Sequence, residues 1–257
     1  MPGVEVQPSA RPRVALVRLN SPERRNALDA ETRRQILAAL DELRGTETRA
    51  VVLTGTDSVF AAGADLRETA RRTSREQRAF IAPPRMYEHV EGYPRPVVAA
   101  ISGHALGAGL ELAMACDARV AAEDARLGAP EIRLGLIPGG GGTQRLPRLA
   151  GMGRALEMIL TGEPISGAEA AVIGLVNRAV ARERVVDEAL DMAEKMARWS
   201  PIALEQAKRA VRLAWRLPIE RGVVAEIEHF MTAYDSQDAK EGVRAFLEKR
   251  EPAFKGR

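Results

Sequence analysis

The sequence predicts an α/β fold followed by an all-helical segment. Up to about residue 182, short runs rich in β-branched residues alternate with helical patterns. Beyond that point only helical patterns follow. A chain of 257 residues suits one large core with an appendage, and no flexible linker interrupts it. We therefore divide it into an α/β core at 1–195 and a helical oligomerisation region at 196–257.

The elements of the core are predicted from apolar runs and from capping residues. Asp29 is a suitable N-cap for a helix whose apolar positions Ile36, Leu37, Leu40 and Leu43 share one face, and Gly45 ends that helix. Buried strands are expected where apolar runs end at turn residues, at 14–19, 50–54, 96–101 and, more weakly, 119–122.

Four helices are expected after about residue 182. The first covers 183–198, and the second opens with Ser200 as its cap and Pro201 in its first turn. Another runs from about 218 to 233, and the last begins after Ser236. Six of the ten aromatic residues lie in this region: Trp199, Trp215, Phe230, Tyr234, Phe246 and Phe254. So many large apolar side chains after a complete core predict an interface with another subunit.

Composition excludes several classes of protein. The 38 basic residues are interleaved with 35 acidic ones, and aromatic residues make up only 4%, so a nucleic-acid surface is not expected. There is no apolar run long enough to cross a membrane and no secretory signal pattern at the start. The single cysteine, Cys116, cannot form an internal disulfide, so we expect a cytoplasmic protein.

Several common sites are also excluded. The stretch from Gly107 to Leu112 lacks the third glycine of a dinucleotide fingerprint, and no glycine loop ends in Lys-Ser/Thr. The three histidines are too scattered for a zinc site, so no metal is expected. Cys116 is predicted to be a core residue, and His104 to be structural or to line a pocket.

Two turns of small residues remain as candidates for chemistry. Ala61-Ala62-Gly63-Ala64-Asp65-Leu66 follows a strand, and Ser102 to Gly109 follows another and runs into the apolar helix 110–115. A turn at the start of a helix offers unpaired N–H groups, and two such turns could hold one developing oxyanion. Taken alone, such turns also occur in α/β folds where they bind nothing.

Two glutamates strengthen the catalytic reading. Glu111 lies in the otherwise apolar helix, where a carboxylate costs free energy unless it is paired or used. Glu131 follows in a loop, and the glycine-rich stretch 139–142 comes next. Two carboxylates beside oxyanion-type turns suit the addition or removal of water next to a carbonyl.

These residues resemble the crotonase superfamily, the enoyl-CoA hydratases and isomerases. The matching stretches span nearly the whole chain in order: 60–66, 96–117, 129–147, 160–162, 174–176 and 242–250. The resemblance implies a spiral of ββα turns with a C-terminal helical trimerisation region, assembled as trimers or dimers of trimers. It also implies an acyl-CoA substrate, with no cofactor besides the coenzyme A of that substrate.

The resemblance further implies roles for individual residues. Glu111 and Glu131 match the two catalytic glutamates of hydratases, Ala64 and Ala108 match the backbone donors of the oxyanion hole, and Gly139 matches a residue that helps to hold the water. For coenzyme A, the expected contacts are Arg24, Ala62, Asp65, Leu66 and Lys255. Arg24 and Lys255 could equally be ordinary surface cations.

Because both acidic positions are occupied by glutamate, the resemblance favours an enoyl-CoA hydratase of the fatty acid β-oxidation type. One alternative is a 3-methylglutaconyl-CoA hydratase-like enzyme, since 137–144 also resembles that subgroup, some members of which bind RNA. Another crotonase-family acyl-CoA isomerase is a further alternative. The acyl pocket is expected to include the stretch 71–93, where the resemblance is weak.

Overall fold

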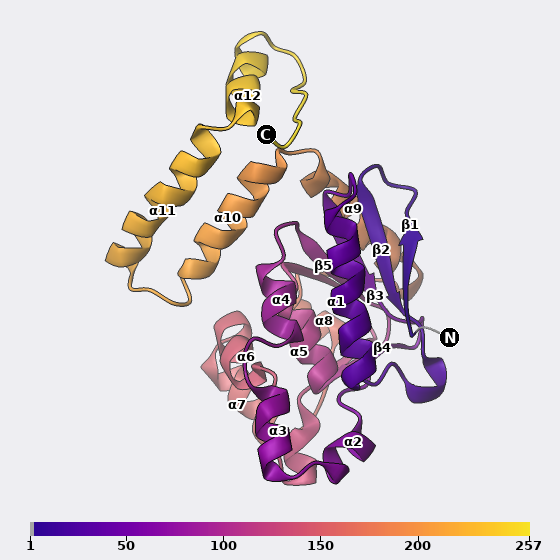
Figure 1. The fold of residues 1–257 in the computed structure, drawn as a ribbon. Helices are drawn as coiled ribbons and strands as arrows, with labels where there is room; N and C mark the ends of the chain where they lie inside the picture. Colours follow the sequence, from indigo (N-terminus) through magenta and orange to yellow (C-terminus); the bar gives the residue numbers. More distant parts are fainter. Residues whose placement is uncertain (1–2) are drawn as a thin grey trace.

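The computed structural model describes residues 3–257, which form two small sheets surrounded by helices (Figure 1). The larger sheet has six strands in the order β1-β2-β3-β5-β7-β10, and all neighbours are parallel except β1 and β2. Its strands are β1 (Val4–Pro8), β2 (Val14–Leu19), β3 (Ala50–Thr54), β5 (Val97–Ile101), β7 (Ala118–Ala122) and β10 (Arg178–Val180).

The smaller sheet has the order β4-β6-β8-β9, with β8 and β9 antiparallel. Its strands are β4 (Val59–Ala61), β6 (His104–Leu106), β8 (Arg126–Gly128) and β9 (Ile165–Ser166). Strands β3, β5 and β7 are each followed directly by a strand of the smaller sheet, so each turn of the chain adds one strand to both sheets. This is the spiral of ββα turns that the resemblance implied.

Helices follow the strand pairs and cover the sheets. They are α1 (Ala30–Arg44), α2 (Leu66–Arg71), α3 (Ser74–Ile81), α4 (Met86–Gly92), α5 (Ala108–Ala115), α6 (Gly142–Ala150), α7 (Met152–Thr161), α8 (Gly167–Val172) and α9 (Val185–Ala197). Three short 3₁₀ helices complete the core: η1 (Pro22–Arg24), η2 (Pro130–Leu134) and η3 (Arg182–Arg184). Asp29 caps α1 through a hydrogen bond from Thr32 N–H, and Gly45 ends it, as predicted.

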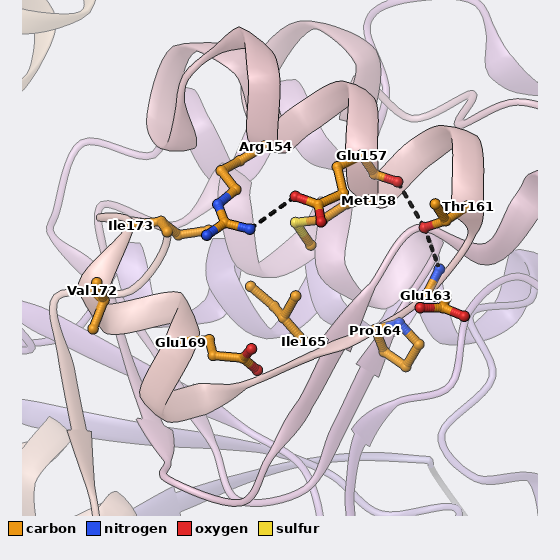
Figure 2. A pocket seen from close by; sticks show the side chains of 10 residues that line it. All are labelled: Arg154, Glu157, Met158, Thr161, Glu163, Pro164, Ile165, Glu169, Val172 and Ile173. Carbon is orange, nitrogen blue, oxygen red and sulfur yellow. Dashed lines mark hydrogen bonds and ion pairs between the residues drawn. The ribbon is translucent and has the colours of Figure 1, made fainter.

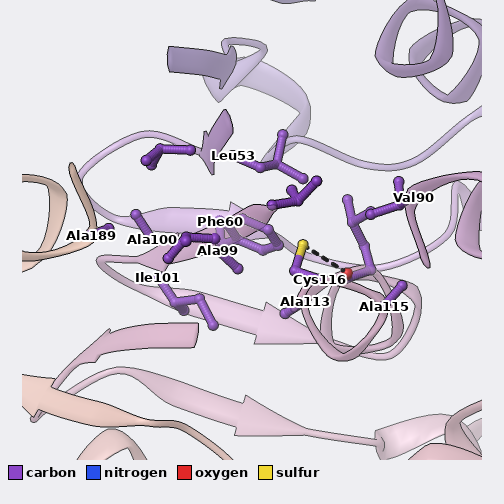
Figure 3. Packing of buried hydrophobic residues seen from close by; sticks show 14 of the residues in the cluster. Leu53, Phe60, Val90, Ala99, Ala100, Ile101, Ala113, Ala115, Cys116 and Ala189 are labelled. Carbon is purple, nitrogen blue, oxygen red and sulfur yellow. Dashed lines mark hydrogen bonds between the residues drawn. The ribbon is translucent and has the colours of Figure 1, made fainter. Parts of the chain in front are cut away.

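The centre of the core is the buried helix α5. All eight of its residues are buried, and it packs against β4, β6 and β7 and against α4 and α6. Figure 3 shows Ala113 and Ala115 of this helix in one cluster with Phe60 and Val90. Cys116, which follows α5, is fully enclosed in this packing, which confirms that it is a core residue. A Cβ at Gly109 would lie only 2.1 Å from the carbonyl oxygen of Ala61, so α5 can approach the end of β4 this closely only with glycine there.

The last three helices form a tail that extends from the core (Figure 1). They are α10 (Pro201–Leu213), α11 (Ile219–Tyr234) and α12 (Gln237–Leu247). Ser200 and Ser236 cap α10 and α12, as predicted. The expected division at 195/196 falls in the last turn of α9, a helix that packs on the larger sheet. Among residues 3–257, no helix has the length and apolarity that a membrane span requires.

Candidate active site

The two turns of small residues lie next to each other at the edge of the smaller sheet. Gly63 comes within van der Waals reach of the Leu106 carbonyl, since a Cβ there would lie 3.3 Å from that oxygen. Within residues 3–257, neither the N–H of Ala64 nor that of Ala108 donates to another backbone carbonyl. Ala108 is the first residue of α5, where helix geometry leaves the N–H without a partner. Two unused donors therefore border the same cavity.

Glu111 lies one turn further along α5 and is held by the glycine-rich loop. Its Oε1 accepts hydrogen bonds from the N–H groups of Gly140 at 2.7 Å and Gly142 at 2.8 Å. The residue is 3% exposed, and this burial raises the pKa of Glu111 above its ordinary value, while the two N–H donors act in the opposite direction. The loop thus fixes one carboxylate oxygen and leaves Oε2 for other contacts.

A buried ion pair supports that loop from behind. Arg145 of α6 donates to the carbonyl of Gly140 at 2.9 Å and to Glu91 of α4 at 2.5 Å. Both side chains are less than one-tenth exposed, and Arg212 of α10 also pairs with Glu91, at 3.1 Å. This network is not predictable from the sequence, because its members are far apart along the chain and resemble surface charges on amphipathic helices.

Glu131 lies opposite Gly107, the residue that precedes α5. It belongs to the first turn of η2 and not to a loop as expected, because Pro130 begins this short helix. Its Oε2 is buried and has no hydrogen-bond partner within residues 3–257. Burial, with a smaller contribution from the nearby Glu111, raises the pKa of Glu131 to about 7. A carboxyl group in this state can hold a proton at neutral pH and release it.

Both glutamates line one cavity of about 500 Å³. The predicted residues Ala62, Ala64, Leu66, Ala108 and Gly139 line it as well. Its outer wall comes from the expected stretch 71–93, through Gln77, Phe80, Ile81, Arg85 and Tyr87. Arg33 of α1, which the sequence analysis did not consider, completes this wall.

Three of the residues expected to contact coenzyme A lie outside this cavity. Arg24 pairs with Asp29 at 2.6 Å and with Asp65 at 2.7 Å, and Asp65 caps α2. Arg24 therefore connects the N-terminus of α1, which Asp29 caps, with the N-terminus of α2, which Asp65 caps. Lys255 follows α12 on the tail, where its N–H donates to Asp238 and its side chain is exposed. Its role in coenzyme A binding stays a prediction.

Other parts of the described chain offer less chemistry. Residues 3–257 contain no group of three His, Cys, Asp or Glu side chains that could hold a metal ion. A second hollow, between α7 and α8, has a volume of about 290 Å³ (Figure 2). Arg154 pairs there with Glu157, and Glu169 accepts a hydrogen bond from Ser166. His104 is exposed on β6, where its ring contacts the carbonyl of Ser58. It does not line the cavity that contains Glu111 and Glu131.

Comparison with known proteins agrees with this architecture. A probable enoyl-CoA hydratase of Bacillus subtilis is 42% identical over 95% of this chain and 95% of its own. The 2,3-dehydroadipyl-CoA hydratase of Escherichia coli is 42% identical over 97% of this chain and 98% of its own. A crystal structure of enoyl-CoA hydratase from Bacillus anthracis matches with a TM-score of 0.91 at 40% identity, over 99% of this chain and 100% of that one.

The sequence model of the family described as enoyl-CoA hydratase/isomerase matches residues 10–257. The resemblance to the crotonase superfamily and the predicted fold are both confirmed by these matches. On the evidence of its sequence and of its fold, the chain belongs to the enoyl-CoA hydratase/isomerase family.

Proposed function

We propose that this protein is an enoyl-CoA hydratase, a hydro-lyase that reversibly adds water across the 2,3 double bond of an enoyl-CoA thioester. The observation that carries this proposal is the convergence of two carboxyl groups, Glu111 and Glu131, on one cavity beside two unused backbone donors. In the proposed reaction one carboxyl group takes a proton from water and the other delivers a proton to carbon. Burial raises the pKa of both groups, and two N–H donors oppose that rise at Glu111 alone, which supports Glu111 as the base and Glu131 as the acid.

Glu111 is the base. Its carboxylate takes a proton from a water molecule, and the oxygen of that water forms a bond to C3 of the thioester. The hydrogen bonds from Gly140 and Gly142 stabilise the ionised form that this step needs. Gly139, whose position in the cavity wall is next to this loop, is proposed to help hold the water.

The electron pair of the double bond moves toward the thioester, whose carbonyl oxygen becomes negatively charged. The N–H groups of Ala64 and Ala108 are proposed to stabilise this enolate, in the manner of an oxyanion hole. Glu131 then delivers its proton to C2, which returns the electrons and completes the addition. A pKa of about 7 leaves a useful fraction of Glu131 protonated at neutral pH.

The substrate's handle and the assembly state are part of the same proposal. We propose that Ala62 and Leu66 contact the coenzyme A portion beside the oxyanion turn, and that Arg24 and Asp65 shape its entrance. Lys255, carried on the tail, is proposed to reach the coenzyme A of a neighbouring subunit in a trimer or a dimer of trimers. The cytoplasmic location expected from the sequence stays a prediction.

The test is an assay of purified protein against a panel of enoyl-CoA thioesters, followed by loss of the conjugated enoyl absorbance. A panel that contains both straight-chain and 3-methylglutaconyl thioesters distinguishes an enoyl-CoA hydratase of the β-oxidation type from a 3-methylglutaconyl-CoA hydratase. Water-dependent loss of absorbance and a 3-hydroxyacyl product are expected. Migration of the double bond without net addition of water would instead identify an isomerase.

A further inference from the structure

The cavity of the candidate active site contains one arginine that forms no ion pair within residues 3–257. Two arginines line this cavity, and the first, Arg85, pairs with Glu88 at 2.5 Å and donates to the carbonyl of Gly139 at 2.6 Å. The second, Arg33, forms no ion pair with any side chain of residues 3–257. The two therefore differ in what they offer to a ligand.

Arg33 is nevertheless held in a defined position. Its Nε donates to the carbonyl of Leu28 at 3.0 Å. The guanidinium carbon lies 4.6 Å from the centre of the Phe80 ring and 5.5 Å from that of Tyr87, within the range of cation–π contacts. Its two terminal nitrogens donate no hydrogen bond to residues 3–257. A guanidinium fixed in this way is prepared to bind a carboxylate through both nitrogens.

The ring of Tyr87 lies between Arg33 and the carboxyl group of Glu111 along the cavity wall. A Cβ at Gly140 would lie 2.2 Å from Oε2 of Glu111 and 2.5 Å from Cε2 of Tyr87, so the tyrosine ring and the glutamate meet at this glycine. Arg33 contacts the same ring. An acyl chain with its double bond at Glu111 can therefore pass along Tyr87 and Phe80 and end near Arg33.

The charge of Arg33 favours an acyl chain that carries a negative group at its end. A purely apolar tail would remove water from the guanidinium and give it no partner, which costs free energy. A chain ending in a carboxylate would supply the missing partner.

We propose that Arg33 determines substrate specificity by binding a terminal carboxylate of the acyl chain, so that the preferred substrates are enoyl-CoA thioesters of dicarboxylic acids. The inference rests on the proposed hydratase function and adds a substrate class to it. Arg33 takes no part in the bond changes, which belong to the two glutamates.

The experiment compares two thioesters of equal chain length, hex-2-enedioyl-CoA and hex-2-enoyl-CoA, with the full-length protein. The wild-type protein is expected to hydrate the diacid with the higher kcat/KM. Arg33→Gln removes the charge and should lower kcat/KM for the diacid by about 10- to 100-fold, as expected for a lost hydrogen bond to a charged group. For the monoacid the change should be much smaller, so the ratio of kcat/KM for the diacid to kcat/KM for the monoacid should fall.

Two further variants serve as controls. Arg33→Lys keeps the charge without the planar pair of donors and should recover part of the activity toward the diacid. Arg34→Gln alters the neighbouring arginine, which is exposed and paired with Glu31, and should change neither substrate's kinetics. Retained monoacid turnover also shows that the Arg33 variants are folded.

The outcomes separate this inference from the function on which it rests. If the wild-type protein hydrates the monoacid but not the diacid, the inference is wrong and the hydratase function stands. If Arg33→Gln lowers kcat/KM equally for both substrates, Arg33 acts on Glu111 or on the coenzyme A portion of the substrate, and the inference is again wrong. If neither thioester is hydrated by the wild-type protein, both proposals fail.

Discussion

Glu111 and Gly140 are in contact on two sides: the glycine's N–H donates to Oε1 of the glutamate, and its Cα faces Oε2 so closely that no side chain fits between them. The loop that orients the carboxylate is therefore also the wall against which it lies. Any widening of this wall has to move the carboxylate.

Gly140→Ala tests this relationship. The new methyl group would lie 2.2 Å from Oε2 of Glu111, so the carboxylate or Tyr87 has to shift. A displacement of about 1 Å in a reacting group can lower turnover by about 100-fold, and a loss of that size in kcat is expected. Gly153→Ala is the matched control, since a Cβ there meets no atom within 4 Å. Normal kcat in the Gly140 variant would show that Glu111 does not need this placement.

The pKa of Glu131 predicts the pH dependence of the reaction. Hydration requires this residue to be protonated, and its pKa is about 7. The value of kcat/KM for hydration should therefore fall as pH rises through about 7, and a pH–rate profile measures it. If the residual kcat/KM of Glu131→Gln falls with pH in the same way as that of the wild type, the decrease belongs to another group.

The same titration is visible without substrate. Because the pKa of Glu131 is higher in the folded protein than its ordinary value of 4.5, the folded state binds this proton more tightly than the unfolded chain. The resulting stabilisation is fully present below pH 4.5 and is lost as pH rises to about 7. Urea unfolding across this range should show Glu131→Gln gaining stability relative to wild type as pH increases. This comparison is an independent check of the kinetic assignment.

Ala108→Pro tests the oxyanion hole. Proline has no N–H, and the first position of a helix tolerates it well, so α5 should still form. Loss of one donor of this kind typically lowers kcat by about 10²–10³-fold. Circular dichroism must show a folded protein, because a distorted backbone would give the same loss. Full activity in the folded variant would remove Ala108 from the proposed role.

The tail predicts assembly. Ile219, Val224, Phe230, Tyr234 and Phe246 are each at least 60% exposed in the single chain, on two adjoining helices. Apolar surface of this extent is typical of an interface between subunits. Light scattering at micromolar concentration should give three or six times the chain mass of 27.9 kDa. Phe230→Glu should lower that mass, and a monomeric wild-type protein would refute the assembly.

The long elements of the fold were predictable because local patterns specify them. Strands β2, β3, β5 and β7 are largely apolar runs, interrupted by Arg18 in β2 and by Arg119 in β7. Helix α1 carries its cap, its apolar face and its final glycine in sequence order. The strands of the smaller sheet were not predictable from local patterns. Its strands have two or three residues each, too few for a period to be recognised, and they are stabilised by pairing with distant segments.

The candidate site was predictable in its chemical groups and not in its supports. Glu111 stands out because an acidic residue interrupts an apolar helix. The role of Glu131 was predicted from the resemblance to the crotonase superfamily. Nothing local marks Glu91, Arg145 or Arg33, since charged residues on a helix usually face water. Their burial or isolation results from tertiary packing that brings α1, α4 and α6 around the cavity.

The central claim is that Glu111 and Glu131 act together on one water and one double bond. The most direct measurement is steady-state hydration of an enoyl-CoA thioester by wild type, Glu111→Gln and Glu131→Gln, with substrate binding measured separately. Each variant should lose about 10²–10⁴-fold in kcat, the range of general acid–base catalysis, while its dissociation constant for the substrate stays close to that of wild type. Near-normal turnover in either variant would contradict the account.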